Sequence, residues 1–259
     1  MLIAQITDTH FLTNNQKLAG KFDTGSAFEH LIESLAKLTV KPDLILYTGD
    51  LGEDATHEEY AHIARELRAL NIPVRAVPGN HDKRAPMIDE LPDMVSVTKD
   101  GHLCCVDTSF DLAIIGLDTI VEGKPHGALC AKRLAWLKQT LTDLKGIPAL
   151  IFMHHPPITT GLRAMDDIGL LEGGAEFKAM IEEHGKIEAI LCGHLHRSIQ
   201  GTFAGVPVRV SPSASHQIEC DLRVDQPYKL VAEPAQYMLH IWNPENGVTS
   251  HTVPVKHPV

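Results

Sequence analysis

The sequence predicts an α/β protein, because apolar segments of strand length alternate with amphipathic segments of helix length over most of the chain. The pattern changes after residue 198, where short apolar runs are separated by Gly, Pro and Asn turns without a helical pattern between them. We find neither an internal repeat nor a linker that would divide the chain, so we expect one domain over residues 1–259.

The individual elements follow from the periodicity of each segment. Six apolar runs predict buried strands, at 2–7, 44–49, 74–79, 112–117, 149–154 and 189–194. Four segments with apolar residues at helical spacing predict helices, at 27–38, 57–70, 131–144 and 175–185. The remaining segment, 198–259, should complete a second sheet and could also carry an oligomer contact.

Composition and charge argue against several kinds of partner. A formal net charge of -10 disfavours a nucleic-acid polymer, because proteins that bind one usually carry a basic excess. The longest apolar runs are far short of the roughly 20 residues of a transmembrane helix. The N-terminus also lacks the basic and apolar regions of a signal peptide. Five cysteines without C-x-x-C spacing predict free thiols, so we expect a cytoplasmic protein with no membrane partner.

Polar residues gather where the predicted strands end. Five of the strands lead into possible metal ligands, in the segments Asp8-Thr9-His10, Gly49-Asp50, Gly79-Asn80-His81-Asp82, His154-His155 and Gly193-His194-Leu195-His196. Each segment alone has an ordinary explanation as a turn, a helix cap or a surface pair. Five of them at the same edge of predicted strands are hard to attribute to chance, because ligands of open α/β sheets bind at that edge.

The chemistry of these side chains predicts a metal centre. Carboxylate, imidazole and amide ligands without thiolates suit Fe, Mn, Co or Zn. There are seven candidate ligands, Asp8, His10, Asp50, Asn80, His154, His194 and His196. Seven exceed the needs of one tetrahedral centre, so we expect two divalent metal ions. A carboxylate that bridges them would hold the ions about 3.5–4 Å apart, a spacing used for displacement at phosphorus.

Taken in order, the motifs D-x-H, GD, GNHD, HHPP and GHLH resemble those of the calcineurin-like metallophosphoesterases, between residues 8 and 196. The chain is most similar to the bacterial class III cyclic nucleotide phosphodiesterases, and especially to their glycerophosphodiesterase branch. The segments ITDTHF, VPGNHD, IFMHHPP, CGHLH and SASHQ (213–217) all look like that branch. The residues after about 220 match poorly.

The resemblance implies a four-layer αββα sandwich of two mixed β-sheets flanked by helices, and it suggests a homo-oligomer. It also implies that Asp8, His10 and His196 hold one ion, that Asn80, His154 and His194 hold the other, and that Asp50 bridges them. Family members with an Fe(III)–tyrosinate centre carry a Tyr three residues after the bridging Asp. Glu53 occupies that position here, which disfavours a purple acid phosphatase.

The expected activity is hydrolysis of small phosphodiesters, either 3',5'-cyclic nucleotides or glycerophosphodiesters. Two divalent ions would lower the pKa of a shared water and present hydroxide to phosphorus. We predict His81 as the general acid for the leaving group, with Asp82 orienting it. The predicted substrate-binding residues are Asn80, His81, His155 and His216.

Several alternatives remain open at this point. His155 could instead hydrogen-bond a metal ligand. The Gly-rich run 158–174 could form a wall of the pocket. A promiscuous phosphomonoesterase is the second candidate activity, and a metal-stabilised binding module is the non-enzymatic one. The native metals and the physiological substrate are not determined by the motifs.

Overall fold

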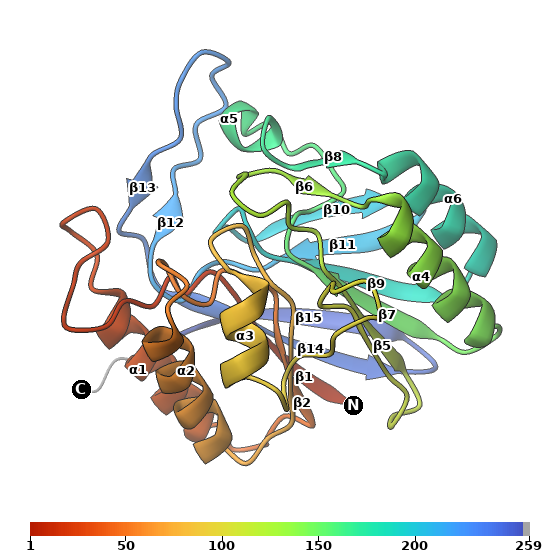
Figure 1. Cartoon of the computed structure of the whole chain (residues 1–259), viewed down its shortest axis with the longest axis horizontal. Helices are drawn as coiled ribbons and strands as arrows, with labels where there is room; N and C mark the ends of the chain where they lie inside the picture. Colours follow the sequence, from red (N-terminus) through yellow and green to blue (C-terminus); the bar gives the residue numbers. More distant parts are fainter. Residues whose placement is uncertain (256–259) are drawn as a thin grey trace.

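The computed structural model describes residues 1–255. Two mixed β-sheets face each other, and helices cover both outer sides (Figure 1). This arrangement confirms the predicted four-layer αββα sandwich. All six predicted strands and all four predicted helices are present, each within about three residues of its expected bounds.

The first sheet has the order β15-β14-β1-β2-β3. Its strands are β1 (Leu2–Ile6), β2 (Leu44–Tyr47), β3 (Val74–Ala76), β14 (Gln236–Asn243) and β15 (Gly247–Pro254). Strands β1, β2 and β3 are parallel to one another, and β14 pairs antiparallel with β1. Side chains alternate along β2: Leu44 and Leu46 pack toward the other sheet, whereas Ile45 and Tyr47 pack against helices.

The second sheet has the order β10-β11-β9-β7-β5-β4. Its strands are β4 (Cys105–Asp107), β5 (Ala113–Leu117), β7 (Ala149–Met153), β9 (Ile187–Cys192), β10 (Ile199–Phe203) and β11 (Val206–Val210). The central strands are parallel, and both edge strands are antiparallel to their neighbours. Of the segment 198–259, which the sequence predicts to complete a second sheet, β10 and β11 pair here, whereas β14 and β15 extend the first sheet.

The helices divide into two groups. On the outer side of the first sheet lie α1 (Thr24–Ala36), α2 (His57–Ala69) and α3 (Arg84–Glu90), and on the outer side of the second lie α4 (Ala131–Asp143) and α6 (Gly174–His184). Helix α2 begins at a capping box, in which the Thr56 side chain accepts from the Glu59 N–H and the Glu59 carboxylate accepts from the Thr56 N–H. Within residues 1–255, the helices are too short or too polar to span a bilayer.

Two smaller pairs of strands and a short helix complete the fold. Strands β6 (Gly127–Ala128) and β8 (Leu170–Glu172) pair with each other, as do β12 (Gln217–Ile218) and β13 (Leu230–Val231). The short helix α5 (Arg163–Asp166) and the loop that joins β12 to β13 lie at the same end of the molecule (Figure 1). These elements stand beside the carboxyl ends of the central strands, where the predicted ligands lie.

A buried glutamine ties the two sheets together below those ligands. The Gln5 amide nitrogen on β1 donates to Thr48 Oγ1 at 3.1 Å and to the Cys192 carbonyl on β9 at 2.9 Å. Gln5 Oε1 accepts from His240 Nε2 on β14 at 3.0 Å. Because all of these groups are buried, each hydrogen bond satisfies an atom that water cannot reach.

Candidate metal centre

Five loops bring the predicted ligands together at the carboxyl ends of strands from both sheets. Asp8 and His10 follow β1, Asp50 follows β2, Asn80 follows β3, His154 follows β7, and His194 and His196 follow β9. Strands β1 to β3 belong to the first sheet, whereas β7 and β9 belong to the second. The cluster therefore lies across the top of both sheets, and six of its seven residues are buried.

The backbone at this cluster is unusual. Five of the seven residues have a positive φ: Asp8 (51°), His10 (44°), Asp50 (51°), His194 (71°) and His196 (49°). Residues other than glycine adopt this conformation rarely and at a cost, and such residues concentrate at functional sites. Two glycines make room for the loops. A Cβ at Gly79 would overlap the Asp50 carboxylate, and a Cβ at Gly193 would overlap Thr7 Oγ1.

Hydrogen bonds orient three of the imidazole rings. Each ring uses Nδ1 as a donor to an oxygen: His10 to Glu53 Oε2 at 2.7 Å, His154 to the Thr48 carbonyl at 2.8 Å, and His196 to the His216 carbonyl at 3.1 Å. Carbonyl and carboxylate oxygens accept only, so Nδ1 carries the proton and a neutral ring keeps a bare lone pair on Nε2. This arrangement is typical of histidines that bind a metal through Nε2.

The three Nε2 atoms point at other acceptors. His10 Nε2 lies 3.1 Å from His196 Nε2, which in turn lies 3.4 Å from Asp8 Oδ1. His154 Nε2 lies 3.1 Å from Asn80 Oδ1. Ligand atoms that share an ion at about 2.1 Å lie about 3–3.4 Å from each other in tetrahedral or octahedral geometry. The spacing of these acceptors therefore fits ligands arranged around cations.

Asp50 stands between the two groups. Its Oδ2 lies 3.5 Å from His10 Nε2 and 3.4 Å from His154 Nε2, so one oxygen reaches a histidine of each group. Burial lowers the pKa of His154, but Asp50 outweighs this effect and raises that pKa to about 9. Asp50 thus favours a positive charge at His154 Nε2, and either a proton on that nitrogen or a cation bound to it could supply the charge.

His194 supplies a separate test of whether the residues fit metal ions. Its Nε2 is buried and has no hydrogen-bond partner among the described residues, while its backbone N–H donates to the Asp8 carboxylate. Burial and the neighbouring histidines hold the pKa of His194 well below its usual value, so the ring is neutral. A neutral imidazole with a buried, unpartnered nitrogen is suited to a metal ion.

His81 is the most exposed histidine of the cluster. Its backbone N–H donates to Asp50 Oδ1 at 2.8 Å, and its Nδ1 lies 3.2 Å from Glu53 Oε2. Burial lowers the pKa of His81, but Asp50 and Glu53 together raise it to about 10. Bound divalent cations would oppose this rise. Glu53 therefore contacts both His10, a predicted ligand, and His81, the predicted acid.

Asp82 does not have the position that the sequence predicts for it. Its carboxylate is buried and accepts hydrogen bonds from the Gly79 N–H at 2.8 Å, the Leu51 N–H at 3.2 Å and the Tyr60 hydroxyl at 2.9 Å. Burial and Asp50 raise its pKa to about 7. Asp82 holds the loops that carry Asp50 and Asn80, and Glu53 makes the contact with His81 that was predicted for Asp82.

His155 also differs from its predicted role. It is fully buried: Nε2 donates to the Pro125 carbonyl at 3.1 Å and Nδ1 accepts from the Thr119 hydroxyl at 2.8 Å. Both nitrogens are occupied, and burial lowers its pKa to about 3. The ring is absent from the residues that line the cavity beside the predicted ligands, and its hydrogen bonds to Thr119 and Pro125 do not indicate the substrate contact that the sequence predicts.

A cavity of about 180 Å³ opens beside the predicted ligands, and its lining includes Asn80, His81 and His216, three of the residues that the sequence predicts to bind substrate. The His216 ring centroid lies 4.6 Å from that of His196 and 5.3 Å from that of His10. Residues Met165 and Ile168 of the run 158–174 also line this cavity.

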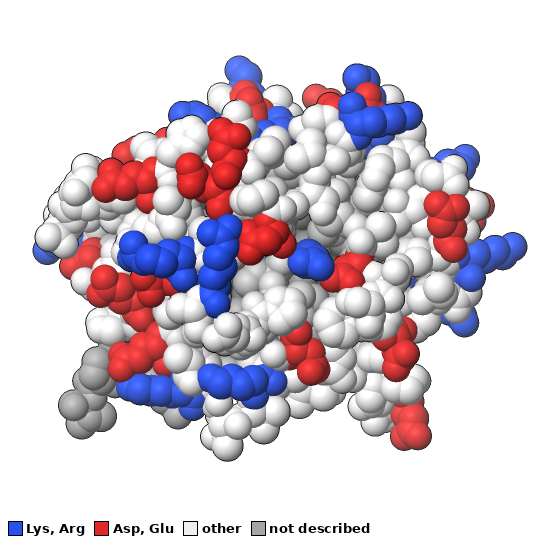
Figure 2. All heavy atoms as spheres, turned by 60° about the horizontal axis from the view of Figure 1, so that its bottom comes forward, with Lys and Arg blue, Asp and Glu red and all other residues white. Residues whose placement is uncertain are grey.

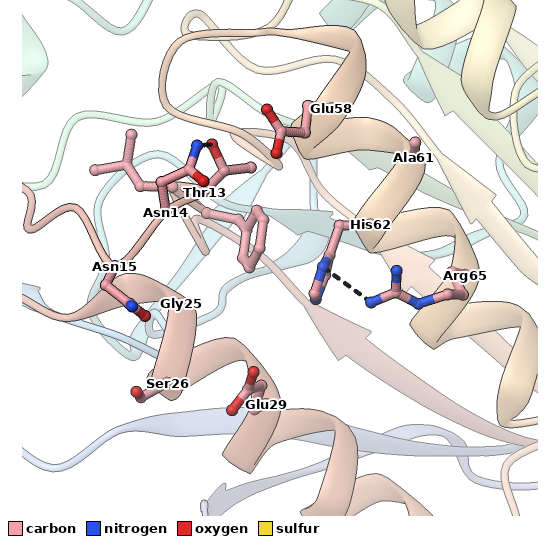
Figure 3. A pocket seen from close by; sticks show the side chains of 12 residues that line it. Thr13, Asn14, Asn15, Gly25, Ser26, Glu29, Glu58, Ala61, His62 and Arg65 are labelled. Atoms are coloured by element: carbon pink, nitrogen blue, oxygen red, sulfur yellow. Dashed lines mark hydrogen bonds between the residues drawn. The ribbon is translucent and has the colours of Figure 1, made fainter.

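A larger cavity of about 390 Å³ lies between α1, α2 and the loop after Phe11 (Figure 3). It is open and polar, and none of the seven predicted ligands lines it. Its link to the ligand cluster is Phe11, which directly follows His10 and stacks on His62 with ring centroids 4.6 Å apart. Of the two cavities, it is therefore the smaller one that borders the predicted ligands.

Charges of both signs are mixed on the face of the molecule drawn in Figure 2. Figure 2 shows one face of the molecule, on which Lys and Arg side chains alternate with Asp and Glu without forming a continuous basic stripe. Long nucleic acids usually require such a stripe.

A scan of family models finds the calcineurin-like phosphoesterase family over residues 1–198. The chain belongs to the calcineurin-like phosphoesterase family. The matched region contains all seven predicted ligands, and the family explains why acidic and histidine side chains cluster at these strand ends.

Several relatives cover most of this phosphoesterase. It is 33% identical over 252 residues to a probable glycerophosphodiester phosphodiesterase of Arcobacter nitrofigilis, covering 97% of this chain and 92% of the relative. It is 29% identical over 220 residues to the 3',5'-cyclic adenosine monophosphate phosphodiesterase CpdA of Escherichia coli, covering 84% and 77%. A dimetal phosphatase structure from Danio rerio shares the fold, with a TM-score of 0.64 at 14% identity and coverage of 98% and 99%.

Sequence reasoning missed two parts of the phosphoesterase site. The resemblance identifies Glu53 only as the residue in place of a Tyr. An acidic residue three positions after Asp50 is also a possible partner for a histidine. Tyr228 and Leu230, which line the cavity, lie in the poorly matching C-terminal segment. No local motif connects that segment with the ligands.

Proposed function

We propose that this chain is a binuclear-metal phosphodiesterase that hydrolyses small phosphodiesters, either 3',5'-cyclic nucleotides or glycerophosphodiesters. One observation carries the proposal. The Nε2 atoms of His10 and His196 lie 3.1 Å apart, each ring has its Nδ1 engaged by an oxygen acceptor, and the Asp8 and Asp50 carboxylates lie beside them. Such a group of acceptors is stable when cations bind between them.

In this proposal, Asp8, His10 and His196 hold one ion, and Asn80, His154 and His194 hold the other. Asp50 is shared, because its Oδ2 lies at similar distances from His10 and His154. When bound, two divalent ions lower the pKa of a water and neutralise the charge that develops on the phosphoryl oxygens. The metals could be Fe, Mn, Co or Zn, since the donor set suits all four.

The residues around the ions position the substrate and supply a proton. The neutral amide of Asn80 coordinates without adding negative charge, which favours an anionic substrate. His81 lines the cavity with its Nδ1 held by Glu53, so Nε2 is the atom left to protonate the departing alkoxide. Glu53 contacts the Nδ1 atoms of both His81 and His10 and so fixes the orientation of the two rings.

A phosphomonoesterase is the alternative activity. A monoester dianion carries one more negative charge than a diester, and the cavity lining within residues 1–255 contains neither lysine nor arginine to balance it. This feature favours the diester. After reconstitution with Mn(II), the test compares turnover of bis(p-nitrophenyl) phosphate with that of p-nitrophenyl phosphate. Faster diester turnover supports the proposal, and absence of diester turnover at full metal loading contradicts it.

We also propose a cytoplasmic location and a homo-oligomeric assembly. All five cysteines are free, which is usual for proteins of a reducing compartment. Light scattering of the purified chain tests the assembly, and a monomer would contradict it.

A further inference from the structure

The cavity beside the predicted ligands is lined by two chemically different sets of residues. The polar lining residues include Asp50, Asn80, His81 and His216. Six other lining side chains are largely apolar, Leu18, Met165, Ile168, Ile218, Tyr228 and Leu230, and we call this set the apolar wall. A phosphodiester held at the polar residues would bring one of its alcohol groups to this wall.

The apolar wall is well supported by the core. Met165 and Ile218 are 3% exposed and belong to the hydrophobic cluster of the second sheet, and Ile168 and Leu230 pack against that cluster. Tyr228 is different, because it is 51% exposed at the mouth of the cavity. The wall therefore combines a fixed apolar surface with one aromatic ring that a ligand can still cover.

The wall offers few polar partners. The Tyr228 hydroxyl is the single side-chain hydrogen-bonding group among its six residues. A hydroxylated arm placed there would lose water without recovering its hydrogen bonds, whereas an apolar or aromatic arm would gain from burial. The volume of about 180 Å³ is also below the roughly 300–1,000 Å³ of sites for drug-sized ligands, which favours a small arm.

We infer that the apolar wall selects monoanionic phosphodiesters with a compact aromatic or apolar arm, and that it discriminates against a glyceryl arm. This inference rests on the proposed function and, of the two substrate classes named there, it disfavours the glycerophosphodiesters. Tyr228 and Ile168 are its specificity-determining residues. The preference arises from the segment between β12 and β13 and from the residues of and after α5, rather than from the metal ligands, so enzymes with the same ligands can differ in substrate.

The test measures binding, so that it does not depend on turnover. Two phosphinate monoanions without a hydrolysable ester, benzyl(methyl)phosphinate and (2,3-dihydroxypropyl)(methyl)phosphinate, are titrated calorimetrically into the Mn(II)-loaded protein. We expect the benzyl compound to bind about tenfold more tightly or better. Tyr228→Ala and Ile168→Ser should each reduce this ratio about threefold or more by weakening only the benzyl compound.

Leu222→Ala is the matched control, because Leu222 is 63% exposed in the same segment between β12 and β13 and does not line the cavity. It should keep the wild-type ratio. Equal affinities in the wild type, a ratio that survives both wall variants, or no binding of either compound would overturn the inference. If the benzyl preference is found but no phosphodiester is hydrolysed, the proposed function fails while the specificity of the wall stands.

Discussion

The Nε2 atoms of His10 and His196 face each other at 3.1 Å, although the two residues are 186 positions apart in the chain. Each ring is turned to this position by a hydrogen bond at its other nitrogen, from His10 to Glu53 and from His196 to the His216 carbonyl. The arrangement brings the loop after β1, in the first sheet, against the loop after β9, in the second sheet. A cation held between the rings, as proposed above, would explain both orientations, and the predictions below follow from that proposal.

Asp50→Asn should remove most of the activity. The substitution keeps the shape of the side chain but removes the charge that lies beside both His10 and His154. We expect kcat to fall by at least about 100-fold and one or both metal ions to be lost. Metal analysis and diester turnover on the same sample check this. Asp89→Asn, at a residue whose side chain is 63% exposed, is the control, and a fully active Asp50→Asn would refute the shared ligand.

Glu53→Gln should weaken the site without dismantling it. Glu53 accepts from His10 Nδ1 at 2.7 Å and lies 3.2 Å from His81 Nδ1, so the variant loses the charge that orients both rings. Outer partners of metal ligands typically contribute about 10–100-fold to affinity or activity. Metal affinity by competition with a chelator, together with kcat, measures the effect. Unchanged values for both would show that Glu53 does not position these rings.

His81→Ala should affect substrates according to their leaving groups. An acid matters most when the departing alkoxide is strongly basic, so alkyl esters should slow by about 100-fold or more while p-nitrophenyl esters change little. The check is a plot of log kcat against leaving-group pKa for the wild type and the variant. A parallel shift of the whole line would contradict the acid role.

Protein stability should fall as the pH decreases, partly because of His240. This ring is buried away from the ligands, donating from Nε2 to Gln5 and accepting at Nδ1 from Ser250, and burial lowers its pKa to about 3. The unfolded chain then binds a proton below about pH 6.5 that the folded chain does not. The contribution of His240 is therefore present above about pH 6.5 and is lost progressively between about pH 6.5 and 3.

This pH effect can be isolated by urea unfolding at pH 7 and pH 5. The cost assigned to His240 is about 2 kcal/mol at pH 5, from about 1.4 kcal/mol per pH unit. His240→Gln should be less stable at pH 7 but should lose about 2 kcal/mol less than the wild type on going to pH 5. His57→Gln, at a side chain that is 61% exposed, should keep the wild-type slope. Identical slopes for all three proteins would refute the assignment.

The clustering of the seven predicted ligands could be predicted because each follows an apolar strand, and the carboxyl ends of such strands meet at one edge. The roles of Glu53 and Asp82 could not be read in the same way. Both are acidic residues near Asp50 or Asn80 in the chain, and only the folded loops determine that Glu53 contacts His81 while Asp82 accepts backbone N–H groups. Tyr228 was missed because its contact with the site depends on tertiary packing alone.

The most direct test of the two-ion site is anomalous diffraction from crystals of the Mn(II)-loaded protein. Our account predicts two Mn peaks about 3.5–4 Å apart, with Asp50 between them. One peak should lie among Asp8, His10 and His196, and the other among Asn80, His154 and His194. A single peak, or two peaks of which neither contacts Asp50, would contradict the account.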